Sequence, residues 1–225
     1  MKPRFLGVLS LTCLVGSILW LALMIAGIAG AGALDTFDQV LAHVSKLDTL
    51  FYLSYLNAAF LVTIPAILLM TGLYVYCKPV NPAWMVLGAA FIPIYGAMNL
   101  FAYLSQVTVV PALIELRQVA EYQAACDVLL RLTIQEWPGS GMAFFNALAY
   151  GILGIPSIVF GIALVKHQHP QKWGGVLLAL NGAACIPGVI GSLTGNSLLR
   201  SGVMLGGLLF ILALFTLSWS FLRMK

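Results

Sequence analysis

Amides and phenols are the polar side chains that recur inside the long charge-free stretches of this 225-residue chain. Counting 1.5 Å of helix rise per residue from the ends of each stretch places several of them at a similar depth, in the half nearer the acidic connectors. Tyr103 shares this depth, whereas Asn181 lies toward the opposite end. The candidate site residues are Asn57, Tyr95, Asn99, Asn146 and Tyr150.

These candidate residues have two interpretations. In the first, the amides hydrogen-bond to neighbouring helices and fix the packing, at about 0.6 kcal/mol each in a membrane. In the second, amides and phenols line a pocket open to the outer leaflet and hold an uncharged or zwitterionic ligand. Prolines inside the apolar stretches favour the pocket, because each removes a backbone hydrogen bond and can kink a helix away from its neighbours. They are Pro65, Pro93, Pro156 and Pro187.

Residue types that usually supply catalysis do not converge in the sequence. His43, His167 and His169 all fall in polar connectors, so no Ser–His pair or histidine-rich metal site can form among the apolar stretches. Ser140, in Gly-Ser-Gly, is similar to the serine of rhomboid proteases, but no histidine follows in a later apolar stretch. The four cysteines are scattered without a Cys-x-x-Cys motif. We therefore expect no catalytic residue, no metal and no cofactor.

Composition excludes a water-soluble globule, because 61% of the residues are apolar and 8% are charged, against about 45–50% and about 25% in soluble domains. Six charge-free runs each exceed the roughly 20 apolar residues that cross a bilayer core. The sequence therefore predicts one all-α domain, 1–225, which is a polytopic membrane protein with six transmembrane helices. The predicted spans are about 6–29, 51–76, 84–106, 142–165, 173–194 and 198–222.

Charge alternates between successive connectors. The N-terminus, the 2–3 and 4–5 connectors and the C-terminus carry basic residues and no acid, whereas the other connectors carry all seven acids. Because cationic residues near span ends are retained in the cytoplasm, both termini are predicted to be cytoplasmic. The basic face indicates contact with anionic lipid, not with nucleic acid. The first apolar run exceeds the roughly 7–15 residues of a signal-peptide core, so we expect it to be retained; cleavage would leave five spans.

The longest connector, about 107–141, predicts an amphipathic interfacial helix between the third and fourth spans. On a helical wheel, Arg117, Glu121, Asp127 and Arg131 fall within an arc of about 120°, opposite a cluster of apolar residues. Arg117–Glu121 and Asp127–Arg131 are i,i+4 pairs, each expected to contribute about 0.2–0.5 kcal/mol. A second short surface helix is expected within 34–50, where apolar and charged residues alternate at intervals of three and four.

Two similar hexapeptides suggest an internal repeat. Gly-Ala-Ala-Phe-Ile-Pro at 88–93 and Gly-Ala-Ala-Cys-Ile-Pro at 182–187 share five of six residues, and an Ile-Pro precedes each in the neighbouring span. The pattern predicts a duplicated hairpin, 51–106 and 142–194, of the kind seen in transporters. Chance matching in so apolar a chain is the alternative.

The fifth span is predicted to begin at Pro170-x-x-Trp173-Gly174. With this motif, six spans and short basic turns, the chain resembles uncharacterised six-helix prokaryotic integral membrane proteins that are grouped as domains of unknown function. The resemblance implies a prokaryotic cytoplasmic membrane and no particular activity.

We expect a non-enzymatic membrane protein that binds a small hydrophobic ligand, a lipid or a protein partner through its outer-half amides and interfacial helices. A facilitative carrier of a small neutral solute is the alternative, favoured by the hairpin repeat and the prolines. A membrane enzyme would need a catalytic group that the sequence does not reveal. Glycines in the fourth and sixth spans suit packing within one bundle, with a homo-oligomer as the other possibility.

Overall fold

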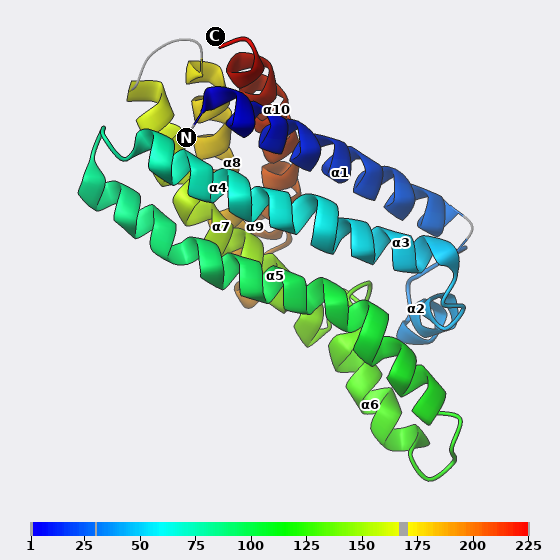
Figure 1. The fold of residues 1–225 in the computed structure, drawn as a ribbon. Helices are drawn as coiled ribbons and strands as arrows, with labels where there is room; N and C mark the ends of the chain where they lie inside the picture. The colour runs from blue at the N-terminus through cyan, green and yellow to red at the C-terminus, as the bar shows by residue number, and fades with distance from the viewer. Residues whose placement is uncertain (1, 30, 167–170, 225) are drawn as a thin grey trace.

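A computed structural model describes residues 2–29, 31–166 and 171–224, and every regular element within them is a helix (Figure 1). The elements are α1 (Pro3–Ala29), α2 (Phe37–Val44), α3 (Thr49–Asn57), the π-helix η1 (Ala58–Thr63), α4 (Ile64–Cys77), α5 (Pro82–Leu116), α6 (Gln123–Thr133), α7 (Gly141–Lys166), α8 (Lys172–Thr194), α9 (Ser197–Arg200) and α10 (Gly202–Leu222).

Six helical segments are long and apolar enough to cross a membrane, which confirms the number predicted from the charge-free runs. Five of them match the predicted ranges to within three residues at each end. The second comprises α3, η1 and α4 in continuous succession. The segments are Pro3–Ala29, Thr49–Cys77, Pro82–Leu116, Gly141–Lys166, Lys172–Thr194 and Ser197–Leu222.

The third span was predicted to end near residue 106, and helix α5 continues beyond that point to Leu116. Its last turns bury Val110 and Ile114 in a second apolar cluster, which also contains residues of α2 and α6. Gln106 links α5 to the end of α6. Its Nε2 donates to the Thr133 carbonyl at 2.9 Å, and its Oε1 accepts from the Gln135 N–H at 3.0 Å. The helix extends because α2 and α6 cover these turns.

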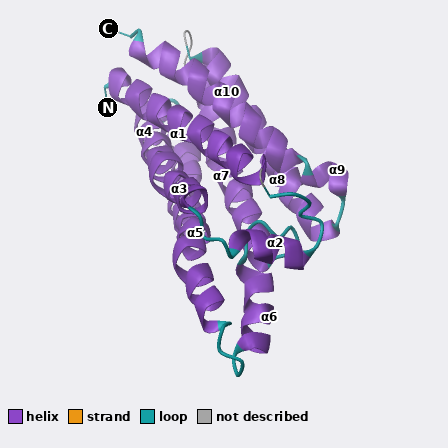
Figure 2. Cartoon of the chain, turned by 90° about the vertical axis from the view of Figure 1, so that its right-hand side faces the viewer, coloured by secondary structure: helices purple, strands orange, loops and turns teal. Residues whose placement is uncertain are grey.

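The amphipathic segment is also shorter than predicted. Helix α6 covers Gln123–Thr133 and turns back beside the end of α5 (Figures 1 and 2). The predicted Arg117–Glu121 pair is wrong, because 117–122 form the turn between the two helices, and Arg117 instead pairs with Asp127. Arg131 does not pair with Asp127; it lies over the Phe37 ring, 4.4 Å from its centroid. Long-range packing of α5, α6 and α2 therefore replaces the local pairs.

The short helix expected within 34–50 is present as α2, with Thr36 and Gln39 forming a capping box at its start. Figures 1 and 2 place α2 and α6 toward one end of the bundle. The start of α1, the end of α10 and the α4–α5 turn lie at the other end. The basic connectors and the acidic connectors are thus at opposite ends of the molecule.

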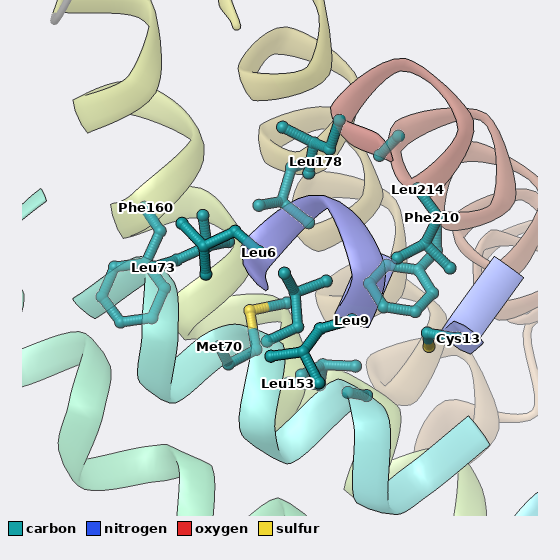
Figure 3. Close-up of a cluster of buried hydrophobic side chains, with 14 of the residues drawn as sticks. Leu6, Leu9, Cys13, Met70, Leu73, Leu153, Phe160, Leu178, Phe210 and Leu214 are labelled. Atoms are coloured by element: carbon teal, nitrogen blue, oxygen red, sulfur yellow. The ribbon is translucent and has the colours of Figure 1, made fainter. Parts of the chain in front are cut away.

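The main core lies toward the end that holds the chain termini. Figure 3 shows buried side chains from α1, α4, α7, α8 and α10 meeting there. Leu6, Met70, Phe160, Leu178 and Leu214 are each 0% exposed. Tyr95 of α5 also belongs to this cluster, and Tyr150 of α7 packs against it.

Helices α7 and α8 approach closely at glycines. A Cβ built on Gly182 would collide with the carbonyl oxygen of Gly154 and lie 2.8 Å from Ile158 Cγ1. About two helical turns further along α7, a Cβ on Gly161 would lie 2.6 Å from the carbonyl oxygen of Gly175. This backbone-to-backbone contact is typical of small residues at membrane helix interfaces.

The two hexapeptides that suggested a repeat have different surroundings. The space beside Gly88 is filled by Phe160 and Val159 of α7, whereas Gly182 packs against the backbone of Gly154 within its own hairpin. The duplicated hairpin stays a prediction.

Candidate functional site

The site is organised around α5, which presents three of its polar residues on one buried face. Tyr95, Asn99 and Tyr103 are four residues apart and therefore align along the helix, and none is more than 1% exposed. The helix is long and supported at both ends, so these side chains have fixed positions relative to α3, η1 and α7.

On one side, Asn99 connects α5 to the π-helix. Asn99 Nδ2 donates to Thr63 Oγ1 at 2.9 Å and to the Tyr95 hydroxyl at 3.2 Å. Thr63 Oγ1 in turn donates to the Ala58 carbonyl, five residues back, at 2.9 Å. Pro65 lies two residues further on and has no N–H to continue a regular helix, which accounts for the wider turn at η1. The π-helix thus places a threonine hydroxyl where Asn99 can reach it.

On the other side, Tyr103 connects α5 to α7. The hydroxyls of Tyr103 and Tyr150 are 2.6 Å apart and share a hydrogen bond. The Tyr95 and Tyr150 rings also meet, with centroids 6.3 Å apart. Asn146 lies one turn before Tyr150 on α7, near the Tyr103 hydroxyl. We call Thr63, Tyr95, Asn99, Tyr103, Asn146 and Tyr150 the polar cluster.

Two amide oxygens of the polar cluster are buried without a partner among the described residues, namely Asn99 Oδ1 and Asn146 Oδ1. The orientation of the Asn99 amide follows from its neighbour: because the Thr63 hydroxyl gives its proton to Ala58, it must accept from Asn99, and the amide nitrogen faces it. A buried acceptor without a donor costs about 1–3 kcal/mol, so each oxygen has an unused capacity to accept a hydrogen bond.

The structure brings together four of the five candidate residues and separates the fifth. Asn57 Nδ2 donates to the Gly16 carbonyl of α1 at 2.8 Å, a contact that ties two helices together. Sequence reasoning left two members of the cluster out of the candidate set. Tyr103 could have been found, because it continues the four-residue spacing of Tyr95 and Asn99. Thr63 gave no such signal, because a single hydroxyl in an apolar span shows its role only through its partner.

Two cavities lie elsewhere and contain none of the candidate residues. One, of about 170 Å³, lies beside Asp48 and Glu136, at the end of the bundle that holds α2 and α6. The other, of about 350 Å³, lies between the start of α5 and the end of α7, beside Trp84 and Lys166. Ligand binding by the polar cluster therefore remains a prediction that rests on its unpaired oxygens.

Ser140, which was considered for catalysis, has a structural role. Ser140 Oγ accepts from the Ala143 N–H at 2.9 Å and caps the start of α7. The cysteines in the described part of the chain are buried and free. No group of three or more His, Cys, Asp or Glu side chains there is placed to hold a metal ion. Of the three histidines, His167 and His169 lie outside the described residues.

Comparison of this chain with protein-family models, with curated proteins and with solved structures found no match. Of the motif behind the predicted resemblance, Trp173 and Gly174 begin α8, while Pro170 lies outside the described residues.

Proposed function

We propose that this chain is a six-span protein of a prokaryotic cytoplasmic membrane, with both termini in the cytoplasm, and that its polar cluster binds a small ligand from the outer half of the bilayer. The ligand is uncharged or zwitterionic and carries at least one hydrogen-bond donor. No chemical step is proposed, because the cluster contains amides and hydroxyls and no acid–base pair.

Location in a bilayer is supported by the outside of the bundle. Large apolar side chains are exposed along the spans, among them Phe101 at 59%, Met204 at 75% and Phe215 at 57%. Such a surface is costly in water and suited to lipid. Helix α6 also exposes Val128, Leu129 and Leu132, which supports contact with the membrane interface at the acidic end.

The observation that carries the ligand proposal is that two unpaired amide oxygens, those of Asn99 and Asn146, lie in one polar cluster, whereas those of Asn57 and Asn181 lie outside it. A hydroxyl, amide or ammonium proton from a ligand would satisfy them, and in surroundings of low dielectric constant such a hydrogen bond is strong. Asn146 is half-buried, as are its neighbours on the first turns of α7, so this side of the cluster is the less covered one.

A facilitative carrier is the second candidate, and one observation favours it. The π-helix η1 lies next to the polar cluster, and α5, α7 and α8 each contain a proline in their interior. Breaks of this kind at membrane depth allow helices to bend around a bound solute. Saturable uptake of a solute into liposomes containing the protein would favour this candidate.

Native mass spectrometry of the purified chain tests the ligand proposal. We expect a small molecule or lipid to remain bound to the wild type, and to be lost from Asn99→Leu and Asn146→Leu. Asn181→Leu is the matched control, because Asn181 is also a buried amide with an unpaired Oδ1 but donates to Gly206 of α10, outside the polar cluster.

Retention of the bound molecule by both cluster variants would refute the proposal. Size-exclusion chromatography of each variant shows whether it is still folded. Asn146→Leu is the safer variant in this respect, because Asn146 is half-buried and Asn99 is fully buried.

A further inference from the structure

The cavity at the outer end has an unusual lining for a membrane protein. It measures about 170 Å³ and is bounded by the last turns of α1, by α2, by the start of α3 and by the α6–α7 connection. Apolar side chains such as Met24 and Ile28 form one wall. The opposite wall contains His43, Asp48 and Glu136, so two carboxylates face a largely apolar space.

Glu136 is the most exceptional of these residues. Its Oε2 is fully buried and makes no hydrogen bond with the described residues. Burial raises the pKa of the Glu136 carboxyl above its ordinary value, and the nearby Tyr55 hydroxyl offsets only part of this effect. In the part of the chain that the structure describes, the ion pair within 4 Å joins Arg117 to Asp127, and none is made by Glu136.

The other polar groups of the cavity also have atoms that are available to a ligand. Asp48 uses Oδ1 to cap α3, accepting from the Phe51 N–H at 2.8 Å, which leaves its second oxygen available. His43 Nδ1 is buried and unpaired. No Lys or Arg lines the cavity. An unpaired buried carboxylate is unfavourable unless a cation or donors compensate it, so the cavity is complementary to a positive charge.

We propose that this cavity binds a small organic cation, an alkyl- or arylammonium group, with its nitrogen paired to Glu136 and its apolar part against α1. Phe51 also lines the cavity, and an aromatic ring attracts an ammonium group. A dry cavity of about 150 Å³ accommodates a benzene ring, so 170 Å³ fits a ligand of that size. An inorganic ion fits less well, because the walls are mainly apolar and the acids do not form a metal-binding group.

This site is separate from the polar cluster. No residue is shared by the two, although Tyr55, next to Glu136, has its ring 6.2 Å from that of Tyr103. The two proposals can therefore fail independently. One is tested by ligand loss from the Asn99 and Asn146 variants, and the other by loss of cation binding to the cavity beside Glu136.

The test compares benzylamine, which is cationic at neutral pH, with benzyl alcohol, a neutral molecule of nearly the same shape. Binding of each to the purified full chain in detergent is measured by isothermal titration calorimetry. We expect benzylamine to bind at least about tenfold more tightly, because a hydrogen bond to a charged group discriminates by at least that factor. Equal affinities would overturn the proposal without any mutation.

Variants locate the binding site. Glu136→Gln should weaken benzylamine binding at least about tenfold and leave benzyl alcohol unaffected. Asp48→Asn preserves the helix cap and should weaken binding less than about fivefold, because Asp48 is exposed. Asp38→Asn is the control: Asp38 is an exposed acid of α2 that does not line the cavity, and its replacement should change nothing. Unchanged benzylamine binding in Glu136→Gln would refute the assignment.

Discussion

Replacing Gly182 with alanine tests the close contact between α7 and α8. The new Cβ would collide with the carbonyl oxygen of Gly154, a backbone atom that cannot rotate away, and would lie 2.8 Å from Ile158 Cγ1. Overpacking of this kind costs about 1–3 kcal/mol, and the backbone contact places it in the upper part of that range. Alanine is better than glycine in a helix by about 0.5–1 kcal/mol. The net expected loss is therefore about 1–2 kcal/mol.

Thermal unfolding in detergent measures this loss. For a chain of 150–250 residues, 1 kcal/mol shifts Tm by about 2–4 °C, so Gly182→Ala should lower Tm by about 2–8 °C. The matched control is Gly207→Ala in α10, where an added Cβ would meet nothing within 4 Å. This variant should be equal to or slightly more stable than the wild type, by up to about 1 kcal/mol. If Gly182→Ala were as stable as Gly207→Ala, α7 and α8 would not pack backbone to backbone, and the reasoning would be wrong.

Three further predictions concern the outer end, the orientation and Asn57. Because burial raises the pKa of Glu136, the folded protein holds this proton to higher pH than the unfolded chain does. Without a bound cation, the free energy of unfolding of the wild type should therefore fall as pH rises through the raised pKa. The free energy of unfolding of Glu136→Gln should not show this fall. A pH series of melting curves compares the two. Reporter tags after positions 78, 120, 168 and 225 should place 120 outside and the others in the cytoplasm; any other pattern would refute the predicted orientation. Asn57→Leu should reduce the free energy of unfolding by about 0.6 kcal/mol, through loss of its bond to Gly16, without releasing a bound ligand; ligand loss in native mass spectra would instead place Asn57 in the site.

The sequence predicted the polar cluster in part, because its spacing is local. Tyr95, Asn99 and Tyr103 lie on one face of any helix, whatever surrounds it. Pairing between helices is not local, so the Tyr103–Tyr150 bond and the Asn99–Thr63 bond could not be read from spacing. Asn57 was grouped with the others because it lies at a similar depth along its span. It lies on the face of its helix that contacts α1, however, and bonds to Gly16 there.

The end of the bundle that holds α2 and α6 was the least predictable region. Glu136 and His43 belong to different connectors, and the sequence analysis assigned neither to a site. The cavity exists because α2 and the α6–α7 connection both fold against the end of α1 and the start of α3. No periodic pattern encodes that meeting.

Six apolar helices and the segregation of acids from bases follow from the amino-acid sequence, because hydrophobic length and charge act on each segment separately. The end of α5, the partner of Arg117 and the set of unpaired polar atoms follow instead from how the helices pack together. These features depend on contacts between residues far apart in the chain, and their energies are set by the burial that the assembled helices create.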